Sequence, residues 1–162
     1  MNAKPIPQGY EGATPYLICK NAKAAIEFYK KAFGATLVYQ LHMPDGKVGH
    51  AEVRIAGGVV MLADEFPEWK CLSPVTIGGS GSSTLIYVQD VDALFQRAVA
   101  AGARVLQPLE NAFYGDRTCK LEDPSGHAWM FSTRIEDVPP DQMQLRLHAM
   151  CQQGASTPPD KA

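Results

Sequence analysis

Apolar residues recur at helical spacing in two short segments of the chain. The first covers residues 22–33, and its apolar side chains form one stripe: Ala25, Ile26, Tyr29 and Phe33. Asn21 stands before this segment as a candidate N-cap, and Gly34 follows it, where a left-handed residue commonly ends a helix. The pattern predicts an amphipathic helix that covers other structure with one face.

The second helical segment covers residues 91–101, between a candidate N-cap, Asp90, and a terminating Gly102. Most of the remaining chain up to residue 135 favours strands, because short runs rich in apolar residues alternate with turn residues. We expect strands at 14–19, 35–43, 48–56, 59–64, 83–89, 103–109, 117–123 and 127–135.

The order of one strand, one helix and three strands therefore occurs twice, with a repeat period of about 68 to 70 residues. We expect an α+β domain of two βαβββ modules, at 13–65 and 83–135. The connection between them, 66–82, is rich in Pro, Gly and Ser in its second part, which is typical of a mobile linker.

The two ends of the chain fall outside this repeat. Residues 1–12 form an N-terminal arm, and residues 136–152 predict a C-terminal helix with Pro139 or Pro140 in its first turn. One face of this helix carries three apolar residues: Met143, Leu147 and Met150. Residues 153–162 predict a disordered tail.

The composition is that of an ordinary globular protein, with 46% hydrophobic residues, 20% charged residues and a formal net charge of -2. It has no basic surplus for nucleic acid or a membrane surface, so we expect a small-molecule partner. The four cysteines are scattered without a CxxC pair, and the N-terminus lacks the apolar core of a secretory signal. These features favour a cytoplasmic protein.

Four motifs in order carry a resemblance to a known family: AIEFYKKAFGA at 25–35, GHAEVRIAG at 49–57, YGDR at 114–117 and DPSGHAW at 123–129. Over residues 10–152 the chain resembles the vicinal-oxygen-chelate superfamily, and within it the PhnB-like branch of the glyoxalase and bleomycin-resistance proteins. The resemblance implies that both modules curl into a cupped mixed sheet with helices on the convex side and a cavity between the halves. It also implies a homodimer.

Metal-dependent members of that superfamily place His and Glu ligands on the first and last strand of each half. The resemblance puts these positions at four residues: Thr14, Met61, Thr84 and Met130. Hydroxyl and thioether groups are poor ligands for the divalent ions concerned, which favour imidazole and carboxylate. We therefore expect no metal at the usual site and no cofactor, although Asp64 and Glu65 lie close by in the sequence.

The strand 48–56 carries the candidate polar groups of the cup. Alternation places His50, Glu52 and Arg54 on one face and apolar residues on the other. The polar face could bind a ligand or transfer a proton, and it could equally be a solvated or mutually paired strand face.

Further candidates come from loops and from the neighbours of the metal positions. Arg117 could bind an anion, or it could pair with Asp116 to fix its loop. Aromatic walls for an apolar ligand could come from three residues, which could instead only cover the edge of the core: Phe66, Trp69 and Tyr114. Tyr16 is a further binding candidate because it lies next to a metal position, and His127 is expected to play a structural role.

These observations favour a small-molecule-binding protein of the glyoxalase and bleomycin-resistance type without the usual metal site. No catalytic residue is identified. One alternative is a metal-dependent lyase or dioxygenase with ligands shifted to other side chains: His50, Glu52, Asp64 or Glu65. A second alternative is a structural or interaction module.

Overall fold

A computed structural model describes residues 3–154, without side-chain detail for the last two. The first half consists of β1 (Tyr16–Cys19), α1 (Ala22–Phe33), β2 (Thr36–His42), β3 (Val48–Ile55) and β4 (Gly58–Asp64). The second half consists of β5 (Ser83–Tyr87), α3 (Val91–Ala100), β6 (Arg104–Asn111), β7 (Asp116–Glu122) and β8 (Ala128–Arg134). The predicted double βαβββ order is confirmed.

Each half forms a four-stranded mixed sheet, with the strand orders β1-β4-β3-β2 and β5-β8-β7-β6. The first strand of each half pairs in parallel with the last, and the other neighbours are antiparallel. Tyr16 pairs with Met61 in the first sheet, as Leu85 pairs with Met130 in the second. Strands β1 and β4 of the first half are therefore paired in the same register as the corresponding strands β5 and β8 of the second half.

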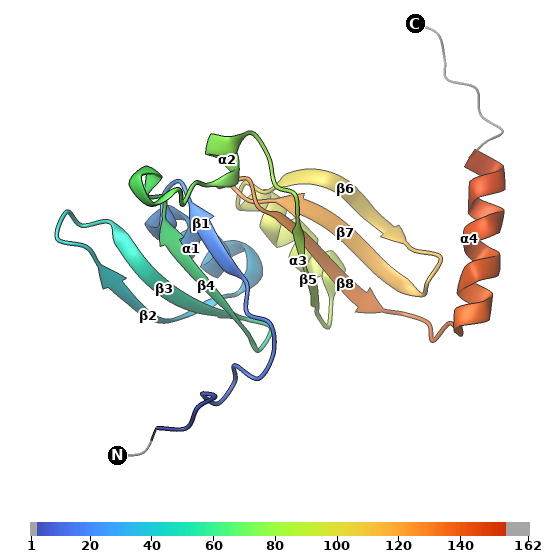
Figure 1. Ribbon diagram of the computed structural model, residues 1–162. Coiled ribbons are helices and arrows are strands. Elements are labelled where there is room, and N and C mark those ends of the chain that lie inside the picture. Colours follow the sequence, from blue (N-terminus) through green and yellow to red (C-terminus); the bar gives the residue numbers. More distant parts are fainter. Residues whose placement is uncertain (1–2, 155–162) are drawn as a thin grey trace, which may run out of the picture.

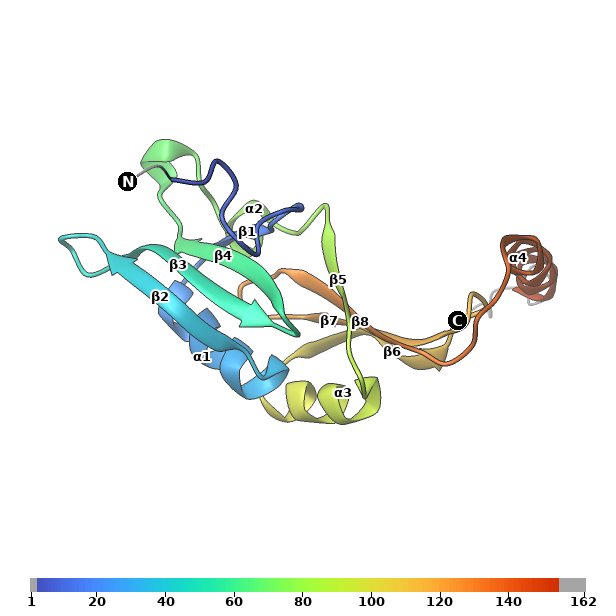
Figure 2. The same ribbon diagram turned by 90° about the horizontal axis from the view of Figure 1, so that it is seen from below.

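Helices α1 and α3 contact each other and lie behind both sheets in Figure 1. Figure 2 shows the two helices together on one side of the sheets. The opposite face of each sheet is called its open face below. The caps follow the predictions, since the side chains of Asn21 and Asp90 accept from Ala24 N and Ala93 N, and Gly34 is left-handed with φ 70°.

The hydrophobic core joins the two halves behind the sheets. Tyr29 and Phe33 of α1 pack against Trp129 of β8, with ring centroids 5.3 and 5.2 Å apart. Phe33 also contacts Phe131, at 4.7 Å. Since both β8 aromatic residues are fully buried, the helix of the first half covers the sheet of the second.

A buried carboxylate, Asp123, ties this core to the turn between β7 and β8. Its Oδ2 accepts hydrogen bonds from the Tyr29 hydroxyl at 2.6 Å and from Trp129 Nε1 at 3.0 Å. Its Oδ1 accepts from the backbone N–H groups of Ser125 and His127. His127 Nδ1 lies 3.2 Å from Oδ2, so the structure gives His127 the structural role expected of it.

The connection between the halves is more regular than its composition predicts. It contains a 3-10 turn at Pro67–Trp69 and a short helix, α2, at Pro74–Ile77. Glu65 holds it in place, because its carboxylate accepts from Lys20, Thr76 and the backbone and hydroxyl of Ser73. The mobile linker predicted from Gly and Ser content therefore includes a helical turn at its start.

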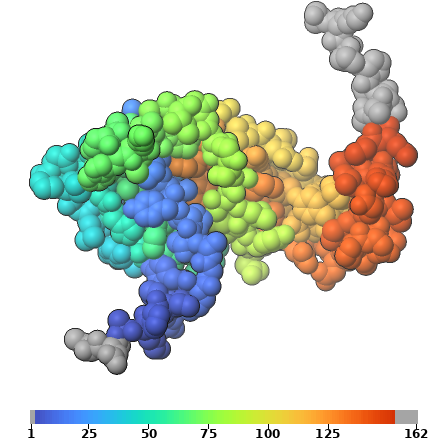
Figure 3. All heavy atoms as spheres, in the orientation of Figure 1, coloured from blue at the N-terminus to red at the C-terminus, as the bar shows by residue number. Residues whose placement is uncertain are grey.

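The C-terminal helix, α4 (Pro140–Gly154), begins four residues later than the predicted segment. The preceding residues are extended, and Val138 among them is buried. Figure 3 shows α4 standing beside the rest of the molecule. The predicted disordered tail lies outside the described residues from position 155 onward.

Candidate functional site

Strand β3 separates apolar and polar side chains as predicted. Ala51, Val53 and Ile55 are buried in the core, and His50 and Glu52 point to the open face of the first sheet. In the register, Glu52 lies beside Met61 of β4 and Tyr39 of β2, and Met61 lies beside Tyr16 of β1. One row across the open face therefore brings two tyrosines, a methionine and a carboxylate together.

The Glu52 carboxylate is the centre of a hydrogen-bonded network on this face. Its Oε1 accepts from the Tyr39 hydroxyl at 2.7 Å and lies 3.4 Å from His50 Nε2. Its Oε2 accepts from the hydroxyl of Tyr10, which comes from the N-terminal arm. The Glu52 side chain is only 5% exposed, so these donors replace the water that the carboxylate loses.

His50 links this carboxylate to Tyr16. His50 Nδ1 lies 3.0 Å from the Tyr16 hydroxyl, and the imidazole centroid lies 5.6 Å from the ring centroids of both Tyr16 and Tyr39. With its proton on Nε2, His50 donates to Glu52 and accepts from Tyr16. This arrangement joins the edge strand β1 to the buried carboxylate.

The network keeps its carboxylate charged and its hydroxyls neutral. Burial raises the pKa of Glu52, but the hydrogen bonds from Tyr10, Tyr39 and His50 outweigh burial, so the pKa lies below its usual value. The hydrogen bonds to Glu52 raise the pKa of both Tyr10 and Tyr39. At neutral pH, Glu52 is therefore an acceptor that requires donors.

An aromatic cavity lies next to the network, between the first sheet and the connection that follows β4. Its volume is about 330 Å³, and its lining comes from β1, β3, β4 and the connection: Tyr16, Ile18, Gly49, Ala63, Phe66, Trp69 and Cys71. The rings of Phe66 and Trp69 lie 4.9 Å apart, and Trp69 is 61% exposed. Two predicted wall residues, Phe66 and Trp69, therefore lie together beside Tyr16.

The open face of the second sheet carries different chemistry at the same backbone positions. Leu85, Met130, Lys120 and Gln107 form the row that corresponds to the row through Glu52. One step further along, the Tyr87 hydroxyl donates to Asp116 Oδ2 at 2.6 Å, and Arg134 Nε lies 3.7 Å from Asp116 Oδ1. The second face has a tyrosine–carboxylate pair but no histidine beside it.

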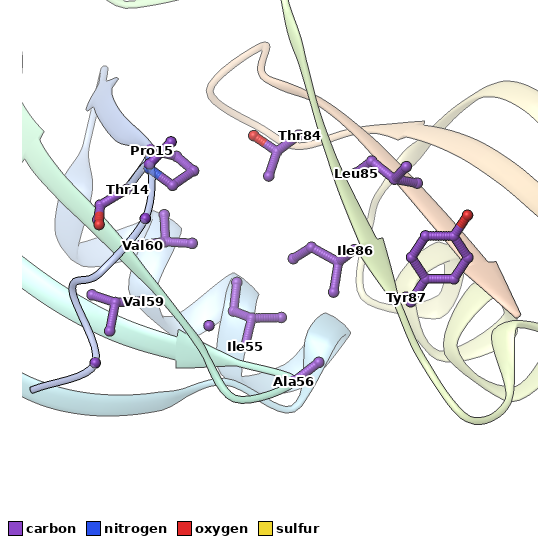
Figure 4. A pocket seen from close by; sticks show the side chains of 14 residues that line it. Thr14, Pro15, Ile55, Ala56, Val59, Val60, Thr84, Leu85, Ile86 and Tyr87 are labelled. Atoms are coloured by element: carbon purple, nitrogen blue, oxygen red, sulfur yellow. The ribbon is translucent and has the colours of Figure 1, made fainter.

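A groove of about 400 Å³ separates the two halves at their edge strands. In Figure 4, Thr14, Pro15 and Val60 line one side, and Thr84 and Ile86 line the other. Thr14 and Thr84 thus border one groove, while Met61 and Met130 lie on the open faces of separate sheets. Thr84 pairs with the core residue Trp129, so its side chain lies on the opposite face of the sheet from Met130.

The structure gives Arg117 a partner that the sequence did not predict. Arg117 Nε and Nη2 donate to the two carboxylate oxygens of Asp92 on α3, each at 2.6 Å, and Nη1 donates to Asn111. Neighbouring strand residues face opposite sides, so Arg117 and Asp116 do not form the pair considered above. Tyr114, the third predicted wall residue, packs edge-on against Phe113 and is not among the residues that line the aromatic cavity.

The shifted metal ligands are not brought together. Asp64 points away from His50 and Glu52, and its two oxygens accept from Ala22 N and Val48 N, each at 2.6 Å. Glu65 holds the connection, as described above. Within residues 3–154, no group of three or more His, Cys, Asp or Glu side chains could hold a metal ion. The donors at the family's metal positions do not fit the divalent ions either.

The two buried cysteines, Cys19 and Cys119, lack the surroundings of a nucleophile. Burial raises the pKa of Cys19 to about 12 and that of Cys119 to about 11, so both thiols stay protonated. Cys71 borders the aromatic cavity, and Cys151 is exposed on α4.

Sequence reasoning missed two residues of the network, Tyr10 and Tyr39. Unbroken alternation along β2 would place Tyr39 on the same face as Leu37 and Leu41. A register shift between Leu37 and Tyr39 breaks that alternation, and Tyr39 instead pairs with Glu52. Tyr10 lies in an arm without regular structure, and no sequence pattern indicates its contact.

Comparisons with known proteins agree with this fold. Residues 13–131 match the Glyoxalase/Bleomycin resistance protein/Dioxygenase superfamily. The chain is 41% identical over 144 residues to the uncharacterized protein Mb0911c of Mycobacterium bovis, covering 87% of this chain and 93% of that protein. No helix of the described chain is long and apolar enough to cross a membrane.

Two solved structures share the fold. TioX from Micromonospora sp. ML1 is 28% identical to this chain, with a TM-score of 0.59, and the alignment covers 76% of this chain and 100% of TioX. The PhnB protein from Bacillus cereus, a putative 3-demethylubiquinone-9 3-methyltransferase, is 20% identical, with a TM-score of 0.58 over 76% of this chain and 99% of that one. The match over residues 13–131, which covers more than half of the chain, shows that the chain belongs to the Glyoxalase/Bleomycin resistance protein/Dioxygenase superfamily.

Proposed function

We propose that the protein binds a small molecule at the open face of the first sheet without using the family's usual metal site. The observation that carries this proposal is the juxtaposition of the Tyr16–His50–Glu52 network with the aromatic cavity beside Trp69. Ligand sites are typically apolar cavities with a few polar groups that orient the ligand, and this region combines both.

The ligand has an apolar or aromatic part that fits the cavity and a polar part that reaches the network. The cavity of about 330 Å³ lies at the small end of ligand pockets, which limits the buried part to roughly one or two rings. The exposed indole of Trp69 offers a stacking surface at the entrance.

A thermal-shift screen with a panel of small aromatic compounds, followed by calorimetry on the hits, tests this proposal. Tyr16→Leu gives the first sheet the residue that the second sheet carries, Leu85, and should weaken binding at least tenfold. Leu85→Ala is the matched control on the second sheet and should leave the affinity unchanged. Equal losses in both variants would contradict the proposed site.

The same samples test two further expectations. We infer a homodimer from the family resemblance, and light scattering after size exclusion should give twice the mass of the chain. A cytoplasmic location is inferred separately, from the four cysteines without a CxxC pair. Elemental analysis of the purified protein distinguishes the metal-dependent alternative, because near-stoichiometric metal that restores an activity would favour a lyase or dioxygenase.

A further inference from the structure

The N-terminal arm, residues 3–13, reaches the ligand site with a single side chain. The Tyr10 hydroxyl donates to Glu52 Oε2. The other hydrogen bonds of the arm in the described chain join its own residues: Tyr10 N donates to Pro7 O, and Gly9 N donates to the Glu11 carboxylate. The arm is exposed except at Tyr10, which is half-buried. Figure 2 shows it on the side of the sheets opposite to the helices.

The arm is held mainly by this phenol, and Gly9 also lies beside the Arg54 guanidinium, whose Nη2 would be 3.5 Å from a Cβ at that position. Its glycines, Gly9 and Gly12, and Ala13 border the groove between the halves without filling it. A segment with few buried apolar contacts and local hydrogen bonds opens at a low free-energy cost. Tyr10 can thus leave Glu52 while the sheets remain folded.

When Tyr10 leaves, Glu52 Oε2 needs another donor. Its carboxylate is buried, and in the described chain Tyr10 is the side chain that donates to Oε2, whereas Tyr39 and His50 serve Oε1. A buried acceptor left without a donor destabilises the protein, and a charged acceptor does so more strongly than a neutral one. Any molecule that displaces the arm must therefore bring its own O–H or N–H group.

We propose that Tyr10 is an internal occupant of the ligand site, and that the ligand is a ring-sized apolar molecule whose hydroxyl displaces Tyr10 and donates to Glu52 Oε2. This inference rests on the proposed function and specifies its ligand class. The arm is a competitor of the ligand, because both use the same carboxylate oxygen.

The second half provides a matched pair that lacks this exchange. The Tyr87 hydroxyl also donates to a buried carboxylate, Asp116. Tyr87 belongs to strand β5, whose backbone is paired with β8. A tyrosine held in a sheet cannot swing away as one in an arm can, so the second pair is fixed and only the first is exchangeable.

The experiment measures binding of 4-methylphenol, which reproduces the tyrosine side chain, and of toluene, which lacks the hydroxyl. The full chain, Tyr10→Ala and Tyr87→Phe are titrated by NMR. Removing the competitor should tighten 4-methylphenol binding about tenfold in Tyr10→Ala, corresponding to an arm closed roughly 90% of the time in the full chain. Toluene should bind Tyr10→Ala at least tenfold more weakly than 4-methylphenol, and Tyr87→Phe should behave like the full chain.

Equal affinities of the full chain and Tyr10→Ala for 4-methylphenol would overturn the competition, and equal affinities of toluene and 4-methylphenol would overturn the hydroxyl requirement. If Tyr16→Leu still weakens a ligand from the screen while Tyr10→Ala has no effect, the proposed function stands and this inference fails. If neither 4-methylphenol nor any screened compound binds, both fail.

A second readout follows the arm itself. In protein containing 3-fluorotyrosine at its six tyrosines, the signal that is absent from Tyr10→Phe belongs to Tyr10. Saturating 4-methylphenol should move this signal to the position of an exposed tyrosine. An unchanged Tyr10 signal at saturation would overturn the displacement.

Discussion

The open faces of the two sheets have the same backbone and different chemistry. In the first, the central row reads Tyr16, Met61, Glu52 and Tyr39, and in the second it reads Leu85, Met130, Lys120 and Gln107. The methionines coincide, but within this row the tyrosines and the carboxylate belong to the first sheet, whereas the second sheet has its tyrosine–carboxylate pair, Tyr87 and Asp116, one step further along. The two halves thus share a backbone scaffold but differ in the side chains of their open faces.

The halves also differ on the side of the helices. The turn between β3 and β4, at Ala56 and Gly57, is exposed. The corresponding turn between β7 and β8 carries Asp123, which binds the core through Tyr29 and Trp129. The second half therefore contributes the polar anchor of the shared core, and the first half contributes the candidate binding face.

The largest effect should follow from removing that anchor. Asp123→Ala leaves the Tyr29 hydroxyl, the Trp129 indole N–H and two backbone N–H groups buried without an acceptor, which should cost about 4 kcal/mol or more of unfolding free energy. Urea unfolding measures the loss. The control is Asp137→Ala, an exposed carboxylate paired with Arg134, which should change stability by less than about 1 kcal/mol. Similar values for the two variants would contradict the anchoring role.

Two equivalent turn glycines sharpen the comparison further. Gly46 and Gly115 have φ values of 87° and 96°, so alanine at either position is strained by about 1 to 2 kcal/mol. A Cβ at Gly46 meets nothing within 4 Å, whereas one at Gly115 collides with Glu136 O and lies 2.8 Å from Val138 Cγ2. Gly115→Ala should therefore destabilise the protein by about 1 to 3 kcal/mol more than Gly46→Ala in urea unfolding. Equal losses of unfolding free energy in the two variants would contradict this, because they would show that Glu136 and Val138 move away from the added methyl group at no energetic cost.

Glu65, which follows β4 in the first half, should make the unfolding free energy of the protein depend on pH. Hydrogen bonds from Lys20 and Thr76 lower the pKa of Glu65 to about 2, from an ordinary value of 4.5. A depressed pKa stabilises the fold above the ordinary value, and the contribution is lost as pH falls toward the folded value. The stability difference between the natural protein and Glu65→Gln should be about 1.5 to 3 kcal/mol at pH 7 and should shrink between pH 4.5 and about 2. A difference that is constant with pH would contradict this role.

The smallest effects should come from the helix caps, where the halves are most alike. The side chains of Asn21 and Asp90 accept from Ala24 N and Ala93 N, each at 2.9 Å. Replacing either by alanine should cost about 1 kcal/mol in thermal or urea unfolding. The Asp90 variant should lose a few tenths of a kcal/mol more, because its charge also interacts with the helix dipole. A cost for one cap several times that of the other would show that the helices are not equivalent.

Local patterns were sufficient for the elements and for the alternation of β3. Helical spacing, caps and turn residues act over a few positions, so the stripe of α1 and the face of His50 and Glu52 could be read directly. The partner of Arg117 could not, because Asp92 lies 25 positions away and its position depends on how α3 packs. The contacts of Asp123 with Tyr29 and of Tyr10 with Glu52 were missed for the same reason, since these partners lie 94 and 42 positions apart.

The connection after β4 and the start of α4 show a second limit. Pro, Gly and Ser content predicts flexibility, but Glu65 supplies acceptors that order the residues around Ser73 and Thr76. Pro140 begins α4, while Val138 before it is held in the core by contacts that the helical pattern does not contain. Tertiary contacts decide both boundaries.

The central claim is that the first open face binds the ligand and the second does not. Met61 and Met130 occupy corresponding positions on these faces, so their methyl groups, labelled with carbon-13 and assigned with Met61→Leu and Met130→Leu, report on both in one titration. With a ligand from the screen, the Met61 signal should shift saturably and the Met130 signal should move much less. A saturable shift confined to Met130, or equal shifts at both methyl groups, would contradict the account.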